Sequence, residues 1–293
     1  MNIAIEWTSM AFRALLLDGE KIVGDKKSDR GTTTVANGAF EATLREELGD
    51  WIQQAERILL SGMITSRNGW IESPFAMVPA GPENLVARAV THKIDGLPPL
   101  ILLPGIAQTN PLPDVMRGEE MSLFGLEQTD GLFVLPGPHA KWVTMEHGHI
   151  TGITTYMSGE ILNLLKKDSL VSRLIPPTYE GRPDAFRRGV ETAYQQDAFP
   201  GKILARIFSA RSLVLFDQLQ PEDIADYLAG LMIGAEIREA LGTDRSRNIT
   251  IVGHTALAEN YKHALDLAGA QAVLSSPATE KGFIRLQRVL GPS

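Results

Sequence analysis

Two stretches of the chain share one pattern of apolar and polar positions. Residues 3–23 read as an apolar strand, a polar break at Glu6–Ser9, a second strand, a turn at Asp18-Gly19 and a third strand. Residues 132–153 repeat this order, with the turn at His147-Gly148. Glycine tolerates the positive φ of a tight turn, so both stretches predict three-stranded antiparallel meanders. Each meander opens one half of the chain, which indicates a duplicated α/β domain whose two hairpin loops could face one ligand.

Strand and helix patterns alternate in the rest of the chain. Apolar residues recur at helical spacing over residues 40–52, and short apolar runs predict buried parallel strands at 57–60 and 100–103. An amphipathic helix is expected over residues 221–242, opened by a proline and closed by a glycine. Residues 248–274 read as a strand, a tight loop, a helix and a strand. This alternation predicts an α/β fold whose ligands gather beyond the carboxyl ends of the strands.

Two segments interrupt the alternation. Residues 114–127 predict a loop entering a helix, whose two leading acids suit the positive end of the helix dipole. Residues 172–202 are rich in proline, glycine and charge, and predict a surface excursion. The domain boundary falls best between the acidic helix and the second meander. We therefore expect one domain over residues 1–128 and another over 129–293.

Composition narrows the function mainly by exclusion. The 293 residues are 44% hydrophobic and 22% charged, as in an ordinary globular protein large enough for two domains. A net charge of −7 argues against a nucleic-acid partner, which calls for concentrated Lys and Arg. The absence of cysteine excludes disulfides, thiolate metal sites and a cysteine nucleophile.

The apolar runs do not predict a membrane protein. Glu6 and Arg13 interrupt the first run, so it does not read as a signal peptide. The longest other run, around residues 228–235, is much shorter than the roughly 20 residues of a membrane span. We expect a cytoplasmic protein with no membrane partner.

The first hairpin break is a candidate phosphate site. A loop that holds a phosphate needs small residues, free backbone N–H groups and hydroxyl donors. The break supplies the hydroxyls of Thr8 and Ser9, and the carboxylate of Glu6 could hold Mg²⁺ through water. The competing interpretation is an ordinary turn.

The second break, residues 136–140, is the matching candidate. Gly137 would permit close approach of a ligand to the backbone, while His139 and the following Lys141 would add positive charge. An ordinary turn is again the competing interpretation.

Two further segments carry groups suited to an acceptor substrate. In Arg117-Gly118-Glu119-Glu120, a carboxylate at a helix start could accept a hydroxyl proton while the arginine holds an anion. The loop Gly62–Trp70 contains Ser66, Arg67 and Trp70, which suit a polyol or a carboxylate. Charge complementarity at a helix start and a tryptophan that anchors a loop explain the same residues without a ligand.

Several other chemistries lack their motifs. The six histidines form no H-E-x-x-H pair, and no G-x-S-x-G nucleophile elbow is present. Neither a Walker A loop nor G-x-G-x-x-G occurs, which weakens P-loop and Rossmann interpretations.

The order of the motifs is similar to that of a known family. The chain resembles the 2-dehydro-3-deoxygalactonokinases, sugar-acid kinases of the actin/hexokinase/Hsp70-type ATPase superfamily, nearly from end to end. The resemblance rests on an EW–TS–FRA opening, GM-x-x-S-x-x-GW, LPGIAQ, DVMRGEE, LPG-x-H-x-KW, M-x-GE, GLMIGAE and a late VG-x-x-AL. RGEE at 117–120 and PG-x-H-x-KW at 136–142, in that order, are the most specific of these.

The resemblance implies a fold and a reaction. The fold would be two actin-like, ribonuclease H-like domains with a ligand cleft between them. The reaction would be transfer of the ATP γ-phosphoryl group to the 6-hydroxyl of 2-dehydro-3-deoxy-D-galactonate in D-galactonate catabolism, with ATP and Mg²⁺ as cofactors. The partners would be ATP and the sugar acid, and a homodimer stays open.

The resemblance also implies roles for individual residues. Glu119 would be the general base, with Glu120 as the alternative, and Arg117 would meet the substrate carboxylate. The other implied contacts are Ser66 and Trp70 with the sugar-acid chain, Thr8, Ser9, Gly137, His139 and Lys141 with phosphate, Gly253 with adenosine, and Glu6 with the metal through water.

Some positions depart from the family pattern. The first loop has Glu6-Trp7-Thr8-Ser9 where the family has Asp-Trp-Gly-Thr, and Pro138 and Ser158 each replace a threonine. Proline lacks both a hydroxyl and a backbone N–H donor. A second hypothesis is therefore a weakened or silent family member that binds a sugar acid without efficient phosphoryl transfer. A hydrolase of the same superfamily is a third.

Overall fold

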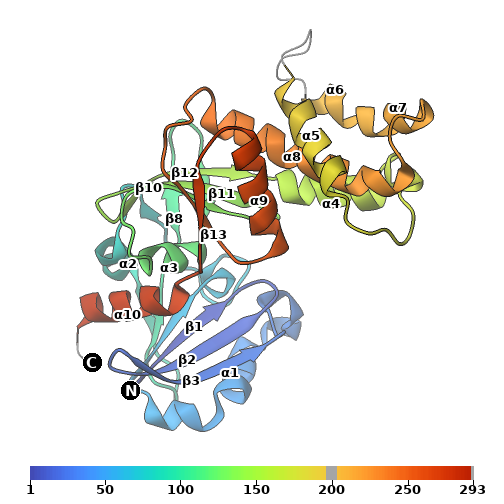
Figure 1. The fold of residues 1–293 in the computed structure, drawn as a ribbon. Coiled ribbons are helices and arrows are strands. Elements are labelled where there is room, and N and C mark those ends of the chain that lie inside the picture. The colour runs from blue at the N-terminus through green and yellow to red at the C-terminus, as the bar shows by residue number, and fades with distance from the viewer. Residues whose placement is uncertain (196–202, 292–293) are drawn as a thin grey trace. The chain divides into compact units, whose positions relative to one another are not determined.

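The chain folds into two units, each around a β-sheet of its own (Figure 1). The computed structural model describes residues 1–195 and 203–291. Contacts assign Met1–Asp130, Thr144–Ile153 and Pro277–Ser293 to unit 1, and Gly131–Val143 and Thr154–Ser276 to unit 2. The domain boundary that the sequence predicted between residues 128 and 129 stays a prediction about the two duplicated halves.

The predicted first meander forms half of a six-stranded sheet in unit 1. Strands β1 (Asn2–Trp7), β2 (Phe12–Asp18) and β3 (Lys21–Ser28) pair antiparallel, and β4 (Arg57–Ser61) runs parallel to β1. The sheet order is β3-β2-β1-β4-β7-β6, completed by β7 (Leu100–Leu102) and β6 (Val90–His92). The strands expected at 57–60 and 100–103 are therefore confirmed.

Helices of unit 1 bury their apolar faces against this sheet. Helix α1 (Phe40–Leu48) packs Phe40, Leu44 and Leu48 into the core. The helix ends earlier than predicted because Gly49 takes a positive φ of 54°, and a 3₁₀ helix, η3 (Gly49–Gln54), follows. The remaining short helices are η1 (Thr32–Thr34), η2 (Ala36–Gly38), η4 (Met63–Thr65) and α2 (Pro82–Arg88).

The acidic segment begins with a strand rather than a loop. Strand β9 (Asp114–Met116) pairs with β8 (Ile106–Gln108) in a three-stranded sheet with β5 (Ala76–Met77). Helix α3 (Glu119–Phe124) follows directly and carries both acids in its first turn, as predicted.

The last helix, α10 (Thr279–Leu290), packs against α3 within unit 1. The amide of Ala278 donates to Ser122 Oγ at 3.1 Å, and Arg285 Nη1 donates to the Phe124 carbonyl at 3.2 Å. A Cβ on Gly282 would lie 1.9 Å from the Met121 carbonyl oxygen, so only glycine permits this approach. Figure 1 shows α10 in red next to α3.

Unit 2 contains the second predicted meander. Strands β10 (Gly131–Leu135), β11 (Ala140–Glu146) and β12 (His149–Tyr156) belong to a five-stranded sheet in the order β12-β11-β10-β13-β14. The end of β11 and the start of β12, within Thr144–Ile153, are assigned to unit 1. Strand β13 (Ile249–Val252) runs parallel to both β10 and β14 (Ala272–Ser275), and α9 (Ala256–Leu267) connects β13 to β14. The predicted strand–loop–helix–strand unit is confirmed.

A group of helices completes unit 2. They are α4 (Ser158–Asp168), η5 (Ser172–Leu174), α5 (Pro183–Tyr194), α6 (Ile203–Ile207), α7 (Ser209–Leu215), η6 (Pro221–Asp223) and α8 (Ile224–Leu241). The sequence predicted an amphipathic helix here. That prediction is wrong for α8, because buried residues occur all around the helix.

The sequence predicted a surface excursion over residues 172–202. This prediction is wrong for α5, which packs against α8. A Cβ on Gly189 would lie 2.1 Å from the Tyr227 carbonyl oxygen, and one on Gly230 would lie 2.0 Å from that of Phe186. Helices α5 and α8 therefore touch backbone to backbone, and the charged residues of α5 face outward. The part of the expected excursion at 196–202 lies outside the described residues.

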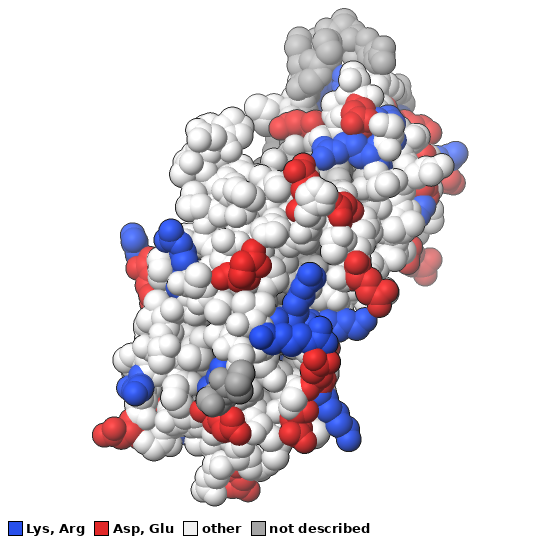
Figure 2. All heavy atoms as spheres, turned by 90° about the vertical axis from the view of Figure 1, so that its left-hand side faces the viewer, with Lys and Arg blue, Asp and Glu red and all other residues white. Residues whose placement is uncertain are grey.

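The surface carries charges of both signs. On the face drawn in Figure 2, basic side chains gather near the middle, with acidic side chains on both sides of them. Among the residues described here, no helix has the length and apolar character needed to cross a membrane.

Candidate active site

The first hairpin loop starts from a rigid anchor at the carboxyl end of β1. Trp7 is fully buried, and its ring meets Phe12 and Phe40 edge-on with centroids 5.0 and 5.9 Å away. Its indole Nε1 donates to the Arg30 carbonyl at 2.8 Å. The loop beyond it is thereby held in one place.

The hydroxyl of Thr8 organises this loop. Thr8 Oγ1 accepts from the amides of Met10 at 3.3 Å and Ala11 at 3.0 Å. The amide and hydroxyl of Thr33 both donate to the Ser9 carbonyl, at 3.2 and 2.6 Å. The threonine that departs from the family pattern thus satisfies two of the loop's own amides.

Glu6 lies in an acidic neighbourhood at the end of β1. It stands opposite Arg13 in the β1–β2 ladder. Burial raises the pKa of Glu6, Arg13 lowers it, and the carboxylates of Glu119 and Glu280 raise it further. Arg13 is itself held by Asp25 at 2.9 Å and by Glu280 at 2.6 Å. Glu6 therefore faces two other carboxylates and an arginine that already pairs with Asp25 and Glu280.

Two glycines bring the start of α3 against the ends of β1 and β4. Gly62 follows β4 with a φ of +96°, and a Cβ there would lie 2.7 Å from the Trp7 carbonyl oxygen. Gly118 precedes α3 with a φ of +112°, and its Cβ would lie 3.2 Å from the Gly62 Cα. These contacts place Glu119 near the first hairpin loop.

The two neighbouring glutamates have different surroundings. Glu119 is half-buried, and its Oε2 accepts from the Arg117 amide at 2.9 Å. Glu120 is fully buried, and both of its oxygens accept from the Gly118 amide, at 2.9 and 2.7 Å. Burial, with a smaller contribution from Glu119, raises the pKa of Glu120 to about 8.

Arg117 directs its guanidinium into the protein. Nη1 donates to the Thr65 carbonyl at 2.6 Å, to Thr65 Oγ1 at 2.9 Å and to Ser73 Oγ at 3.1 Å. Nη2 donates to the Ser73 carbonyl at 3.1 Å, and the group lies 4.3 Å from the centre of the Phe75 ring. Arg117 therefore clamps the segment that follows β4.

The predicted sugar-acid residues lie in this clamped segment. Ser66 Oγ donates to the Met63 carbonyl at 2.7 Å, and Trp70 stacks on Phe40 with centroids 6.3 Å apart. Both side chains shape the loop, and for Trp70 this is the role that the interpretation without a ligand gave it. Their contact with a substrate stays a prediction.

The second hairpin loop rests on the start of α4 in unit 2. A Cβ on Gly159 would lie 2.4 Å from the Gly137 carbonyl oxygen, and the Glu160 amide donates to the Pro138 carbonyl at 2.9 Å. His139 Nε2 contacts the Glu160 carboxylate. A Cβ on Gly137 itself would meet nothing within 4 Å, so this backbone is open to a ligand.

Lys141 is less exposed than a phosphate-binding lysine of a surface loop would be. Its side chain is buried, and Nζ donates to Thr155 Oγ1 at 2.8 Å. The third predicted nucleotide residue, Gly253, follows β13, and its amide donates to the Ser275 carbonyl at 2.9 Å. Since β10 and β13 are parallel neighbours, the second hairpin loop and Gly253 lie at the same edge of the sheet.

The sequence did not predict a buried network beneath the second hairpin loop. Glu236 on α8 is 3% exposed and accepts from Trp142 Nε1 at 2.7 Å and from the Tyr261 hydroxyl at 2.8 Å. The Ser158 hydroxyl at the start of α4 donates to the same carboxylate. A single acid in the apolar GLMIGAE run was the signal that could have revealed it.

The predicted residues therefore form two groups, one in each unit. Glu6, Thr8, Ser9, Arg117, Glu119 and Glu120 gather at the ends of β1 and β4, with Ser66 and Trp70 in the loop that follows β4. In unit 2, Gly137, His139 and Lys141 form one hairpin, with Gly253 on the neighbouring strand. Within residues 1–195 and 203–291, no cluster of three or more His, Cys, Asp or Glu is arranged to hold a metal.

Solved structures of similar fold place this arrangement in a class. A structure from Sinorhizobium meliloti, provisionally assigned as a 2-dehydro-3-deoxygalactonokinase, is 27% identical and covers all of both chains with a TM-score of 0.90. A structure from Porphyromonas gingivalis, provisionally assigned as an N-acetylglucosamine kinase, covers 98% of both chains with a TM-score of 0.52. At 14% identity it shows the fold alone. The protein is an ATP-dependent carbohydrate kinase with two actin-like domains, as predicted.

Its family follows from the sequence comparisons. Residues 6–286 match the 2-keto-3-deoxy-galactonokinase family. The 2-dehydro-3-deoxygalactonokinase of Escherichia coli (strain K12) is 31% identical over 96% of this chain and 95% of its own length. The chain belongs to this family, which confirms the resemblance found in the sequence.

Proposed function

We propose that the chain transfers the γ-phosphoryl group of ATP to the 6-hydroxyl of 2-dehydro-3-deoxy-D-galactonate, with Mg²⁺, in D-galactonate catabolism. The names of its relatives support this substrate. The observation that carries the proposal is the position of Glu119. It lies half-buried at the first turn of α3, next to the hairpin loop that the family uses for phosphate.

Glu119 is the better candidate for the general base. A base must reach the substrate hydroxyl, and Glu119 is partly accessible. Glu120 is fully buried, holds the Gly118 amide with both oxygens, and has a pKa raised to about 8 that favours its neutral form. Glu120 then shapes the turn that presents Glu119.

The chemistry of the donor set fits Mg²⁺ held through water. The carboxylates of Glu119 and Glu280 raise the pKa of Glu6, and the neighbouring Arg13 already has two carboxylate partners. Mg²⁺ keeps several of its waters and needs only one or two carboxylates, so Glu6 alone can hold it indirectly. The ion would neutralise charge on the transferred phosphoryl group.

The nucleotide would use the two hairpin loops. Gly137 offers open backbone beside the start of α4, where the N-terminus of an 11-residue helix favours an anion. Thr8, Ser9, His139 and Lys141 are the proposed phosphate contacts, and Gly253 the proposed adenosine contact. Ser66, Trp70 and the N–H groups of Arg117 not bound to Thr65 or Ser73 are proposed for the sugar acid.

An assay of ADP release over a panel of 2-keto-3-deoxy sugar acids tests the substrate. We expect the highest kcat/KM with 2-dehydro-3-deoxy-D-galactonate and phosphorus coupling to the C6 protons of the product. Turnover with another acid alone would overturn the substrate. ADP release with none of them, together with retained binding of the acid, would establish the silent member that the family match disfavours.

Glutamine variants test the base. Glu119→Gln should abolish ADP release while the circular dichroism spectrum is unchanged, and Glu120→Gln should keep measurable turnover. Glu127→Gln, whose side chain is 94% exposed in unit 1, is the matched control. Full turnover by Glu119→Gln would remove this residue as the base.

A further inference from the structure

One carboxylate in unit 2 is bonded to three elements that meet beside the second hairpin loop. Glu236 lies on α8 and is 3% exposed. Its Oε1 accepts from Trp142 Nε1 on β11 at 2.7 Å, and its Oε2 accepts from the Tyr261 hydroxyl on α9 at 2.8 Å. The Ser158 hydroxyl, in the first residue of α4, is the third donor. The carboxylate therefore joins β11, α4 and α9 to α8.

Each of these three elements adjoins part of the proposed nucleotide site. The second hairpin loop runs directly into β11, so Trp142 stands at the base of that loop. The first turn of α4 touches the loop, because the Glu160 amide donates to the Pro138 carbonyl at 2.9 Å. Helix α9 begins three residues after Gly253, the proposed adenosine contact. The bonds of the carboxylate thus reach every segment of unit 2 that is proposed to hold the nucleotide.

The apolar surroundings of Glu236 argue for a role beyond packing. Trp142, Tyr261 and Ile237 belong to one apolar cluster of unit 2. Transfer of a carboxylate into such surroundings costs free energy, which its hydrogen bonds only offset. Two oxygens with three donors, however, fix the directions of the groups that donate to them. An apolar side chain could fill the same space, but it would not hold β11, α4 and α9 in one arrangement.

We propose that Glu236 is a positioning residue for phosphoryl transfer. It holds the second hairpin loop, the start of α4 and α9 in the arrangement that binds ATP, without touching the nucleotide itself. This role rests on the proposed nucleotide site at the second hairpin loop. Loss of its bonds should lower the affinity for ATP and leave the KM for the sugar acid unchanged. The proposed contacts of the acid, Ser66, Trp70 and Arg117, all belong to unit 1.

Calorimetric titration of the whole chain with ATP and Mg²⁺ measures the effect. Tyr261→Phe and Ser158→Ala each remove one donor to Glu236. Each should weaken ATP binding by about tenfold, which corresponds to the free energy of about one hydrogen bond. Ser158→Thr keeps the hydroxyl and should bind ATP as the parent does. No sugar acid is present in this titration, so the result does not depend on the substrate proposed above.

A buried tyrosine elsewhere on α8 separates positioning from stability. Tyr227 is as buried as Tyr261, and its hydroxyl is bonded to Ser209 Oγ on α7 at 2.6 Å. Tyr227→Phe should lower the free energy of unfolding as Tyr261→Phe does, but it should leave the affinity for ATP unchanged. Equal weakening of ATP binding by both variants would overturn the role, because lost stability alone would then explain it.

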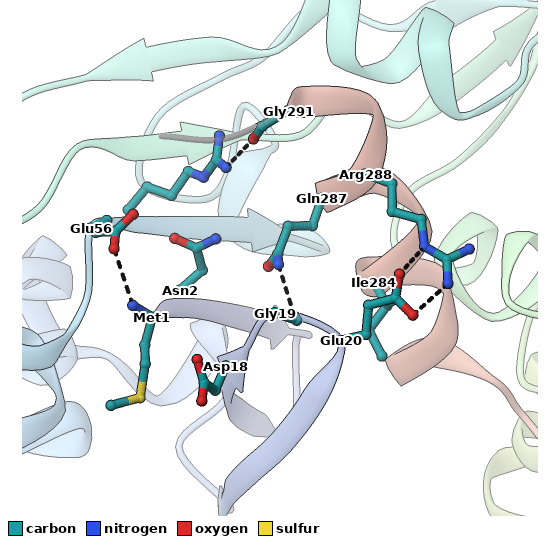
Figure 3. A pocket seen from close by; sticks show the side chains of 11 residues that line it. Met1, Asn2, Asp18, Gly19, Glu20, Glu56, Ile284, Gln287, Arg288 and Gly291 are labelled. Atoms are coloured by element: carbon teal, nitrogen blue, oxygen red, sulfur yellow. Dashed lines mark hydrogen bonds and ion pairs between the residues drawn. The ribbon is translucent and has the colours of Figure 1, made fainter.

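An exposed acid supplies the control for the carboxylate. Glu236→Leu should weaken ATP binding more than Glu236→Gln, whose carbonyl oxygen still accepts. Glu20 pairs with Arg288 at the rim of a cavity in unit 1, which Figure 3 shows, and its side chain is 60% exposed. Glu20→Gln should bind ATP as the parent does. Equal ATP affinity of Glu236→Leu and the parent would overturn the role.

Gly159→Ala separates this role from the nucleotide site itself, because its Cβ would lie 2.4 Å from the Gly137 carbonyl oxygen. Weaker ATP binding in Gly159→Ala, but not in Tyr261→Phe and Ser158→Ala, would overturn the role of the carboxylate and leave the nucleotide site standing. Unchanged affinity in all three variants would overturn both.

Discussion

Replacing Glu120 with glutamine tests whether burial keeps the Glu120 carboxyl, at the start of α3, protonated in the folded protein. The Glu120 carboxyl has no exposed surface and accepts from the backbone amide of Gly118. Burial and the nearby Glu119 raise its pKa from 4.5 to about 8. The folded protein therefore holds a proton on Glu120 at pH values where the unfolded chain has released it.

The sign and size of the effect follow from this difference. Between pH 4.5 and 8 the folded state binds more protons than the unfolded state, so the contribution of Glu120 to stability falls as pH rises. A shift from 4.5 to about 8 corresponds to about 5 kcal/mol when pH lies above both values. Glutamine does not titrate. The stability of Glu120→Gln relative to the parent should therefore rise by about this amount from pH 4.5 to pH 9.

Urea unfolding at a series of pH values measures the effect. Three of the four tryptophans, Trp7, Trp51 and Trp70, lie in unit 1 with Glu120, so their fluorescence reports on that unit. Other titrating groups cancel in the difference between the variant and the parent. Glu127→Gln should show no such trend, because its side chain is exposed. A difference that stays constant from pH 4.5 to 9, or that falls, would refute the reasoning.

Three other substitutions test the hairpin loops and the buried network. Gly159→Ala places a Cβ 2.4 Å from the Gly137 carbonyl oxygen. It should raise the KM for ATP and lower the free energy of unfolding, measured in urea, by about 1–3 kcal/mol. Gly181→Ala is the control, because its Cβ would meet nothing within 4 Å, and it should change neither quantity. Thr8→Val removes the acceptor of two loop amides, so hydrogen exchange at Met10 and Ala11 should become faster, and unchanged exchange would contradict the assigned bonds. Glu236→Leu leaves three buried donors unpaired and should cost more than about 3 kcal/mol, with Glu236→Gln losing less because its carbonyl still accepts. Equal losses by urea unfolding would argue against this account.

The sequence predicted those parts of the fold that depend on local pattern. Alternation and an Asp-Gly turn are enough to define β1, β2 and β3, because a meander pairs neighbours in the chain. Helix α5 lies in a segment read as a surface excursion, because residues 172–202 are rich in proline, glycine and charge. Its one glycine, Gly189, serves contact with α8, a partner distant in sequence that no local pattern reveals. Helix α10 was not predicted, although Phe283 and Leu286 recur at helical spacing.

The site shows the same limit at the level of single side chains. Glu119 and Glu120 are adjacent and chemically identical, and only packing separates a half-buried carboxylate from a fully buried one. Arg117 was predicted to bind an anion. Its partners Thr65 and Ser73 lie more than forty residues earlier, and nothing in the segment around Arg117 points to them. Glu236 belongs to a motif used for recognition, but its three donors come from separate elements.

The place of α10 has a consequence for how the chain acquires its structure during synthesis. Unit 2 is built from residues 131–143 and 154–276, so its contacts can be complete before the ribosome has made the last helix. Unit 1 needs α10 to cover α3 and to hold Arg13 through Glu280. The half of the protein that emerges first therefore finishes folding after unit 2, and until α10 has emerged its α3 surface is open to chaperones and to premature association with other chains.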